Sequence, residues 1–391
     1  MADQNTFHIS DNSTVLTPKA PGMASLVQAL RQGASILATQ SSSNPIHIHP
    51  GDPQWLFCES SGTSGAPKVI RRHPTSWIRS FSVNHTEFEL DAGDTYAVLG
   101  HLGHSLSLYA TLEALHLGAD LVQLSGLRPK MQAAEIAGAS VLYATPTQLR
   151  LLCAGRTATG LSPHRKLRRI FCGGGRLDAE LAKVLPQHFP NAKLHVFFGA
   201  SETSFISISD ADTPLGSVGR TYPGVTLDLR PLPGQGKAIG EIWVSSPYLF
   251  DRYESGTSDD TQWDGRALSI GEMGYLDPGG HLFLVGRKNR MVTVSDHNVF
   301  PEEVERIVAL DPDVSDCAAL AVKDPKRGHH IVCVVVGGSN PALDIRLRTA
   351  CREMLGDASV PRHILHLDTL PLLPAGKPDL QALHALIERK L

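Results

Sequence analysis

The 391-residue sequence lacks the features that mark several classes of protein. Its formal net charge is -3, so no basic excess indicates nucleic acid or an anionic membrane surface as a partner. The first ten residues, MADQNTFHIS, have neither a basic segment nor an apolar core, so they do not read as a signal peptide. The longest apolar runs, such as IVCVVV at 331–336, are far too short to span a membrane. We therefore expect a soluble, cytoplasmic protein.

The sequence also lacks the patterns of a metal or disulfide framework. No CxxC pair occurs among the six cysteines, which stand at 58, 153, 172, 317, 333 and 351. Reduced thiols in a cytoplasm fit this spacing best. There is no HExxH motif, and we predict a loop for the pair His47 and His49, because a metal site needs a third ligand. No GxSxG elbow and no convincing Ser-His-Asp or Cys-His arrangement indicates a protein nucleophile.

What the chain does contain is an alternation of strand-like and helix-like segments. Short apolar strands are predicted at 95–100, 120–124, 140–144, 167–174 and 193–199, with helices at 106–118 and 177–189. Such alternation predicts an α/β fold with largely parallel strands. After residue 213 the chain becomes rich in glycine and proline and carries β-hairpin patterning.

The pattern of the sequence changes again near residue 290. Pro301 opens a helix whose first turns are rich in glutamate, which suits the positive end of the helix dipole. Two apolar strands follow, near 317–324 and 330–338, and then a helix at 341–355. We predict two parts: a large N-terminal core with a β-rich portion from about 214, residues 1–288, and a small α+β domain, residues 289–391.

A glycine-rich stretch, SSGTSGAPKVIRR, runs from Ser60 to Arg72. It has the composition of a phosphate-binding loop but is not a Walker A motif, because Lys68 follows Pro67 and precedes Val69. Taken alone, the stretch is more often a plain turn. Three later motifs change that reading: FFGASETSF at 197–205, SIGEMGYLDPGGHLFLVGRKNRMV at 269–292, and LPAGKPDL at 373–380.

In this order the motifs resemble those of the acyl-adenylate-forming superfamily, which comprises acyl-CoA synthetases, adenylation domains and luciferases. The resemblance runs from about residue 56 to the end, in a compact form with a shortened N-terminal segment. It implies ATP-dependent conversion of a carboxylic acid to acyl-AMP, followed by transfer to the thiol of CoA. It also implies ATP, Mg²⁺ and CoA as cofactors, and rotation of the small domain about a joint near 288–290.

The resemblance assigns roles residue by residue. The phosphates of ATP would lie in the glycine-rich loop, against Ser61, Gly62, Thr63, Ser64, Gly65 and Lys68. The adenine would lie against Gly173, Gly174, Gly175, Phe198 and Gly199. Mg²⁺ would bind Glu202, a hard oxygen ligand. Ser201 would reach the α-phosphate, Glu272 and Arg287 would contact the ribose, and Lys377 would bridge the carboxylate and the α-phosphate. His104 would line the acyl pocket, with a buried core histidine as the alternative.

Some positions depart from the family pattern. The hinge position, normally Asp, is Arg290, and the following Lys and Gly positions are Thr293 and Asp296. Two alternatives therefore stay open: loading of an acyl carrier protein through its phosphopantetheine, and a catalytically weak nucleotide-binding protein. The protein would be a monomer or homodimer.

The acid is expected to lack an α-ammonium group. Amino-acid-activating relatives place an aspartate in the region equivalent to 98–119, where this chain has Gly, His, Leu, Ser and Tyr until Glu113. A buried cation without such a partner is costly. Aryl or other flat apolar acids are favoured.

Overall fold

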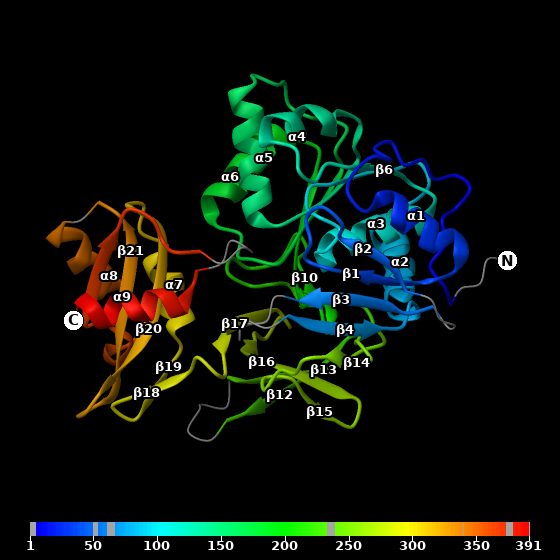
Figure 1. The fold of residues 1–391 in the computed structure, drawn as a ribbon. Helices are drawn as coiled ribbons and strands as arrows, with labels where there is room; N and C mark the ends of the chain where they lie inside the picture. Colours follow the sequence, from blue (N-terminus) through cyan, green and yellow to red (C-terminus); the bar gives the residue numbers. More distant parts are fainter. Residues whose placement is uncertain are drawn as a thin grey trace.

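The computed structural model describes residues 5–49, 54–60, 67–232, 239–338, 340–372 and 378–390. Strands in these ranges form four sheets, three in the larger part of the molecule and one in the C-terminal part (Figure 1). This arrangement confirms the predicted fold class. No helix within the described ranges combines the length and the apolar content that a bilayer crossing requires.

The segments that alternate between residues 95 and 200 build the central sheet. Its order is β11-β10-β9-β8-β7-β5-β6. The strands are β5 (Thr95–Val98), β6 (Asp120–Gln123), β7 (Val141–Ala144), β8 (Arg169–Cys172), β9 (Lys193–Ala200), β10 (Ser204–Ile208) and β11 (Arg220–Thr221). The pairs among β5 to β9 are parallel, whereas β10 and β11 add antiparallel. The predicted parallel strands are thus confirmed.

Helices connect the parallel strands, as the sequence pattern predicted. They are α3 (Ser105–Leu117), α4 (Pro129–Glu135) with the short 3₁₀ turn η1 (Ile136–Gly138), α5 (Pro146–Ala158) and α6 (Ala179–His188). Because parallel strands all end at the same edge, the loops after β8 and β9 lie side by side there. These loops carry the glycine triplet and the Ser201–Glu202 turn.

A second sheet, ordered β14-β4-β3-β1-β2, holds the strands on either side of the glycine-rich loop. Its strands and adjacent helices are α1 (Met23–Gln32), β1 (Ser35–Ala38), β2 (Ile46–His49), β3 (Leu56–Ser60), β4 (Lys68–Arg72), α2 (Thr75–Phe88) and β14 (Arg252–Ser255). The predicted loop at His47 and His49 is wrong. These residues alternate with Ile46 and Ile48 along β2, which pairs antiparallel with β1.

The glycine-rich part after residue 213 forms a third, antiparallel sheet, as predicted. Its order is β12-β13-β16-β15, with β17 also pairing with β16. The strands are β12 (Thr226–Pro231), β13 (Gly240–Ser245), β15 (Gln262–Asp264), β16 (Ala267–Leu276) and β17 (Leu282–Arg287).

The C-terminal part is the predicted α+β unit, and Figure 1 shows it on the side of the molecule away from the N-terminus. Its elements are β18 (Val292–Val294), β19 (His297–Val299), α7 (Pro301–Val308), β20 (Val314–Asp324), β21 (Gly328–Gly337), α8 (Pro341–Leu355), η2 (Asp357–Ser359), β22 (His363–Leu367) and α9 (Leu380–Lys390). The sheet order is β19-β18-β21-β20, with β22 added to β21.

The run IVCVVV explains why this sheet is covered on both faces. Ile331, Cys333 and Val335 pack with apolar side chains of α7 and α8. Val332 and Val334 point the other way and pack with Leu383 and Ile387 of α9. A strand buried on both faces reads as a continuous apolar run, because successive side chains alternate between the faces.

All six cysteines are unpaired thiols, as their spacing predicted. Five are buried, and Cys317 is half-buried. Burial raises the pKa of each, to about 12 for Cys58 and about 11 for Cys351. These side chains pack as small apolar groups.

Glu113 of α3 is the one fully buried carboxyl group among the described residues. It accepts hydrogen bonds from Asn84 Nδ2 at 2.7 Å and from the hydroxyls of Tyr143, Tyr96 and Tyr109 at 2.7, 3.2 and 3.3 Å. Burial raises its pKa from 4.5 to about 7, and these donors offset only part of that effect. Glu113 therefore belongs to a polar network in the core and does not act as the partner of a substrate ammonium.

This raised pKa predicts a pH-dependent stability. Between about pH 4.5 and 7 the folded state holds a proton on Glu113 that the unfolded chain has lost. The free energy of unfolding should therefore fall as the pH rises through this window, by on the order of 3 kcal/mol from this group. Urea unfolding at several pH values should show a flatter dependence for Glu113→Gln. The control is Glu87→Gln, at an exposed residue of α2, which should keep the wild-type pH dependence of the free energy of unfolding. An equal pH dependence in wild type and Glu113→Gln would contradict the prediction.

Candidate active site

The glycine triplet after β8 lies against the aromatic side chains of β9. A Cβ atom on Gly173 would stand 2.2 Å from Cζ of Phe197, so only glycine leaves room for that ring. Gly174 has a φ of +76°, a conformation that glycine adopts without strain. Because β8 and β9 are parallel neighbours, Gly173 follows β8 at the edge where Phe197 lies on β9, and the predicted contact of the triplet, Phe198 and Gly199 with adenine stays a prediction.

Ser201 and Glu202 form a tight turn between β9 and β10. Gly199 is required there, because a Cβ atom on it would stand 1.9 Å from the carbonyl oxygen of Ser204. Thr203 is buried and its Oγ1 accepts a hydrogen bond from the amide of Ala200 at 3.0 Å. The Oγ of Ser201 lies 2.8 Å from the Oγ of Ser105, the first residue of α3. The turn is therefore held by its own backbone and by the start of α3.

The Glu202 carboxylate is oriented by β14. Tyr253 donates its hydroxyl to Oε1 of Glu202 at 2.8 Å, and the amide of Phe250 donates to the Glu202 carbonyl at 2.8 Å. Burial and the nearby carboxylate raise the pKa of Tyr253, so its hydroxyl remains a donor. No Lys, Arg or His in the described ranges forms an ion pair with Glu202.

These contacts fit a magnesium site. Mg²⁺ in nucleotide enzymes is usually held by one or two carboxylates together with substrate phosphates and water, rather than by an all-protein cage. Glu202, oriented by Tyr253 and without a cation at ion-pair distance in the described part of the chain, is suited to that role.

Lys68 opens β4 and is buried beside the same tyrosine. Its Nζ lies 5.9 Å from the centroid of the Tyr253 ring. β3 and β4 are paired in register from Ser60 and Lys68 onward, so the glycine-rich stretch connects two adjacent antiparallel strands. Five of its predicted phosphate ligands lie outside the described residues: Ser61, Gly62, Thr63, Ser64 and Gly65. Lys377 also lies outside them.

Glu272 and Arg287 face each other on β16 and β17. Their backbones are register partners, and Arg287 Nη2 lies 2.9 Å from Glu272 Oε1. The Glu272 side chain is 12% exposed and that of Arg287 is 36% exposed, so the extra methylene relative to Asp is accommodated on the buried side of the ion pair. The preceding Gly271 has a φ of +75°. The sequence predicted that both residues contact the ribose; the structure brings them together.

A chain of contacts joins this pair to the Glu202 turn. The Tyr253 hydroxyl, which binds Glu202, also lies 2.9 Å from Oγ1 of Thr261. The adjacent Asp260 packs on Gly271, where a Cβ atom would stand 3.1 Å from its Cβ. The two groups of predicted ATP contacts therefore border one region.

His104 stands at the N-cap of α3, next to the Ser105 that meets Ser201. Its side chain is exposed. The alternative of a buried core histidine is therefore wrong, and lining the acyl pocket stays a prediction.

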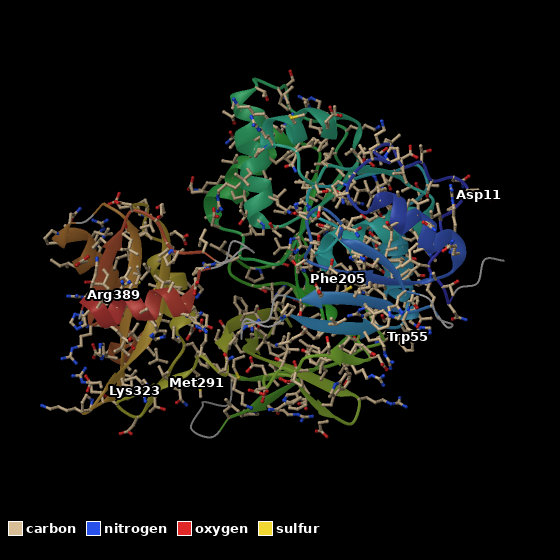
Figure 2. The ribbon with its side chains drawn as sticks, viewed as in Figure 1. Asp11, Trp55, Phe205, Met291, Lys323 and Arg389 are labelled. Atoms are coloured by element: carbon tan, nitrogen blue, oxygen red, sulfur yellow. The ribbon has the colours of Figure 1, made fainter. Side chains whose placement is uncertain are left out.

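The departures near residue 290 have structural explanations. Arg290 forms ion pairs with Glu302 and Glu305 of α7, at 3.2 and 2.9 Å, and donates to the Ala319 carbonyl. Asp296, at the family's glycine position, has a φ of +65°, which Asp tolerates better than most residues. Met291, labelled in Figure 2, lies on the segment that leads into the C-terminal sheet.

Sequence reasoning assigned no role to Arg72, Ser105 or Tyr253. The alternation of Lys68, Ile70 and Arg72 along β4 could have indicated that Arg72 shares the buried face of the strand, but not which groups it contacts there. Ser105 and Tyr253 gave no comparable signal, since each lies more than 50 residues from Ser201 or Glu202 in the chain.

Comparison with known proteins gives matches over most of the chain. A family model described as AMP-binding enzyme matches residues 13–254, and one described as AMP-binding enzyme C-terminal domain matches 303–377. An uncharacterized acyl-CoA ligase of Bacillus subtilis strain 168 is 32% identical, over 87% of this chain and 70% of that protein. A protein of Staphylococcus haemolyticus named "putative long chain fatty acid-CoA ligase" is 30% identical, over 81% of this chain and 67% of that protein. The structure of an amide bond synthetase from Marinactinospora thermotolerans is 25% identical with a TM-score of 0.75, covering 88% and 72%.

Proposed function

Because the chain belongs to the AMP-binding enzyme family, the acyl-adenylate-forming superfamily that its motifs resemble, we propose that it is an AMP-forming acid–thiol ligase. It activates a carboxylic acid with ATP to form acyl-AMP and pyrophosphate, and then transfers the acyl group to the thiol of CoA. The observation that carries this proposal is the chain of contacts that runs from Glu202 through Tyr253 and the 260–261 segment to Gly271, the residue before Glu272.

The chemistry explains why these residue types are needed. A carboxylate is a poor electrophile, because its leaving group would be oxide. Its oxygen attacks the α-phosphorus of ATP in line, a new phosphorus–oxygen bond forms, and the bond to pyrophosphate breaks. Three anionic groups must be brought together, so the protein's work is positional and electrostatic.

Each side chain then has a stated role. Glu202 would hold the Mg²⁺ that neutralises the phosphates, while Tyr253 keeps its carboxylate in place. Ser201 would contact the α-phosphate, and Lys377 would bridge it to the carboxylate. The backbone amides and hydroxyls at 61–65, with Lys68, would receive the leaving pyrophosphate. After adenylation the C-terminal domain, proposed as 289–391, would rotate to admit the thiol.

The function is tested by exchange of labelled pyrophosphate into ATP across a panel of carboxylic acids. We expect exchange with acids that lack an α-ammonium group, including benzoate-like, cinnamate-like and fatty acids, and little with free amino acids. Robust exchange with an ordinary α-amino acid, and none with the other acids, would overturn the proposed substrate class. ATP binding without exchange for any acid would favour the non-catalytic alternative.

The acceptor is tested separately. Free CoA, a phosphopantetheinylated carrier protein and a simple amine are each added to the enzyme with its best acid. We expect product with CoA, as the names of the acyl-CoA ligase relatives indicate. The amine is included because one structural neighbour is an amide bond synthetase.

The ribose assignment gives a further prediction. Glu272→Ala should raise the KM for ATP by about 10-fold or more, because hydrogen bonds to a charged group contribute roughly 1.5–3 kcal/mol. Glu272→Asp should be milder, because it keeps the charge opposite Arg287. Steady-state exchange kinetics measure both, and an alanine variant with an unchanged ATP dependence would show that the ribose does not lie at this pair.

A further inference from the structure

Arg72, the last residue of β4, carries a guanidinium buried in the core of the larger part. The residue is 1% exposed. Its Nη1 donates to Oγ of Ser76 at 3.0 Å and to the carbonyl oxygen of Tyr248. Its Nη2 donates to the carbonyl oxygen of Ser201 at 2.6 Å. The guanidinium carbon also lies 5.3 Å from the centroid of the Trp77 ring.

This cation has no carboxylate partner within ion-pair distance in the described ranges. Burial lowers the pKa of Arg72 to about 10, so the side chain remains protonated at neutral pH. Glu202 lies near enough to raise the pKa of Arg72 but less than burial lowers it, and a hydrophobic residue of similar volume in place of a buried charge would often be neutral or stabilising. General stability is therefore a weak explanation for an arginine here.

The partners of Arg72 come from separate segments that meet at the site. Ser201 follows β9 of the central sheet, Tyr248 precedes β14, and Arg72 itself ends the strand that starts at Lys68. The carbonyl that Arg72 holds is one residue before Glu202. The Tyr248 segment continues to Phe250 and Tyr253, the two residues that hold Glu202 from the other side.

We propose that Arg72 is a positioning residue for the adenylation reaction. Its planar fork fixes the Ser201 carbonyl relative to the 248–253 segment and so sets the place of the Glu202 carboxylate and the Ser201 hydroxyl. Its buried positive charge also faces the region where Glu202 and the phosphates meet. The expected effect of Arg72 on the reaction rate rests on the proposed function. Its expected effect on the Ser201–Glu202 turn does not depend on that function.

The neighbouring Arg71 offers a matched control. It lies on the same strand but on the opposite face, pairs with Asp251 through its Nε at 2.8 Å, and stacks 4.2 Å from the centroid of the Trp55 ring, which is labelled in Figure 2. In the described part of the chain its side chain contacts Asp251, Glu254 and Trp55, and neither Ser201 nor Glu202. Arg71→Lys and Arg72→Lys are the same chemical change, and both keep the charge while removing the fork.

The first measurement is amide hydrogen exchange of the unliganded protein, followed in peptides that cover 199–206 and 248–253. We expect about 10-fold faster exchange in both peptides for Arg72→Lys, because the Thr203 and Phe250 amides are bonded within the turn that Arg72 holds. Arg71→Lys should leave the 199–206 peptide unchanged. Equal exchange of this peptide in the two variants would overturn the proposal, whatever the enzyme's activity.

The second measurement is pyrophosphate exchange with the best acid. Arg72→Lys should lower kcat by about 10- to 100-fold with a small change in the KM for ATP, since misplacement of reacting groups by about 1 Å has an effect of this size. Arg71→Lys should stay within about twofold of wild type. Wild-type kcat in the Arg72→Lys variant would overturn the proposal. If the wild-type protein is inactive with every acid, only the proposed function is overturned.

A milder variant covers the case in which Arg72→Lys does not fold. Ser76→Ala removes one of the acceptors that orient the guanidinium while leaving its bonds to Ser201 and Tyr248. We expect a smaller change in the same direction, about threefold faster exchange in 199–206 and a comparable loss in kcat, at an unchanged Tm. A Ser76→Ala variant identical to wild type in both measurements would count against the proposal.

Discussion

Replacing Lys377 by alanine is expected to slow acyl-AMP formation by about 10²–10³-fold, because the lysine acts on charge that develops in the transition state. The described residues on either side of 373–377 are fixed: Leu372 and Pro378 form an antiparallel bridge, and the amide of Asp379 donates to the Pro371 carbonyl at 2.8 Å. The substitution should therefore leave Tm unchanged. Single-turnover formation of acyl-AMP is the measurement, because it isolates this step from thiol transfer.

The control is Lys323→Ala, an exposed lysine on β20 of the same C-terminal part (Figure 2). It removes the same charge from the domain but from a residue with no proposed role in adenylation. Wild-type rates are expected for Lys323→Ala. Near-normal acyl-AMP formation by Lys377→Ala would show that the C-terminal motif has been assigned wrongly.

Glu202→Gln is expected to lower the rate of pyrophosphate exchange by about 10²-fold and to raise the Mg²⁺ concentration needed for half-maximal rate. The amide keeps the size of the side chain and can still accept the Tyr253 hydroxyl, so the loss is that of the negative charge. A 10²-fold effect corresponds to roughly 2.7 kcal/mol of transition-state stabilisation. Exchange kinetics as a function of Mg²⁺ concentration measure both quantities.

Tyr253→Phe separates orientation from ligation. It removes the hydrogen bond to Glu202 Oε1 but leaves the carboxylate, so a smaller loss of roughly 10-fold is expected. Two results would show that Glu202 does not hold the metal. One is a loss of exchange rate in Tyr253→Phe as large as that in Glu202→Gln. The other is an unchanged Mg²⁺ dependence in Glu202→Gln.

The sequence predicted those parts of the fold that depend on local pattern. The helix at 341–355 and the strands of the central sheet follow from periodicity, because each buries one face or both against neighbours nearby in the chain. His47 and His49 show the limit of this reasoning. They lie on β2 because Ile46 and Ile48 alternate with them and because β1 supplies the hydrogen bonds, and a polar pair read in isolation does not reveal that partner.

Site residues could be predicted from the sequence where only one residue type fits the position. They could not be predicted where the role of a residue comes from contacts with distant parts of the chain. Gly173 and Gly199 are required by atoms that would collide with a Cβ, and glycine marks them in the sequence. The role of Arg72 depends on carbonyl groups 129 and 176 residues away, and no local pattern encodes those partners. Tyr253 meets Glu202 across 51 residues for the same reason.

The cysteines are distributed so that they can report local opening in both parts of the molecule. Three stand in the larger part, at 58, 153 and 172, and three in the C-terminal part, at 317, 333 and 351. Because burial shields the five buried thiols and keeps them protonated, an alkylating reagent can react with them only as fast as the surrounding structure opens. The labelling rate of each buried thiol therefore measures how often the structure around that thiol opens. Cys58, whose thiol adjoins Arg72 and Ser105, reports from directly behind the Ser201–Glu202 turn.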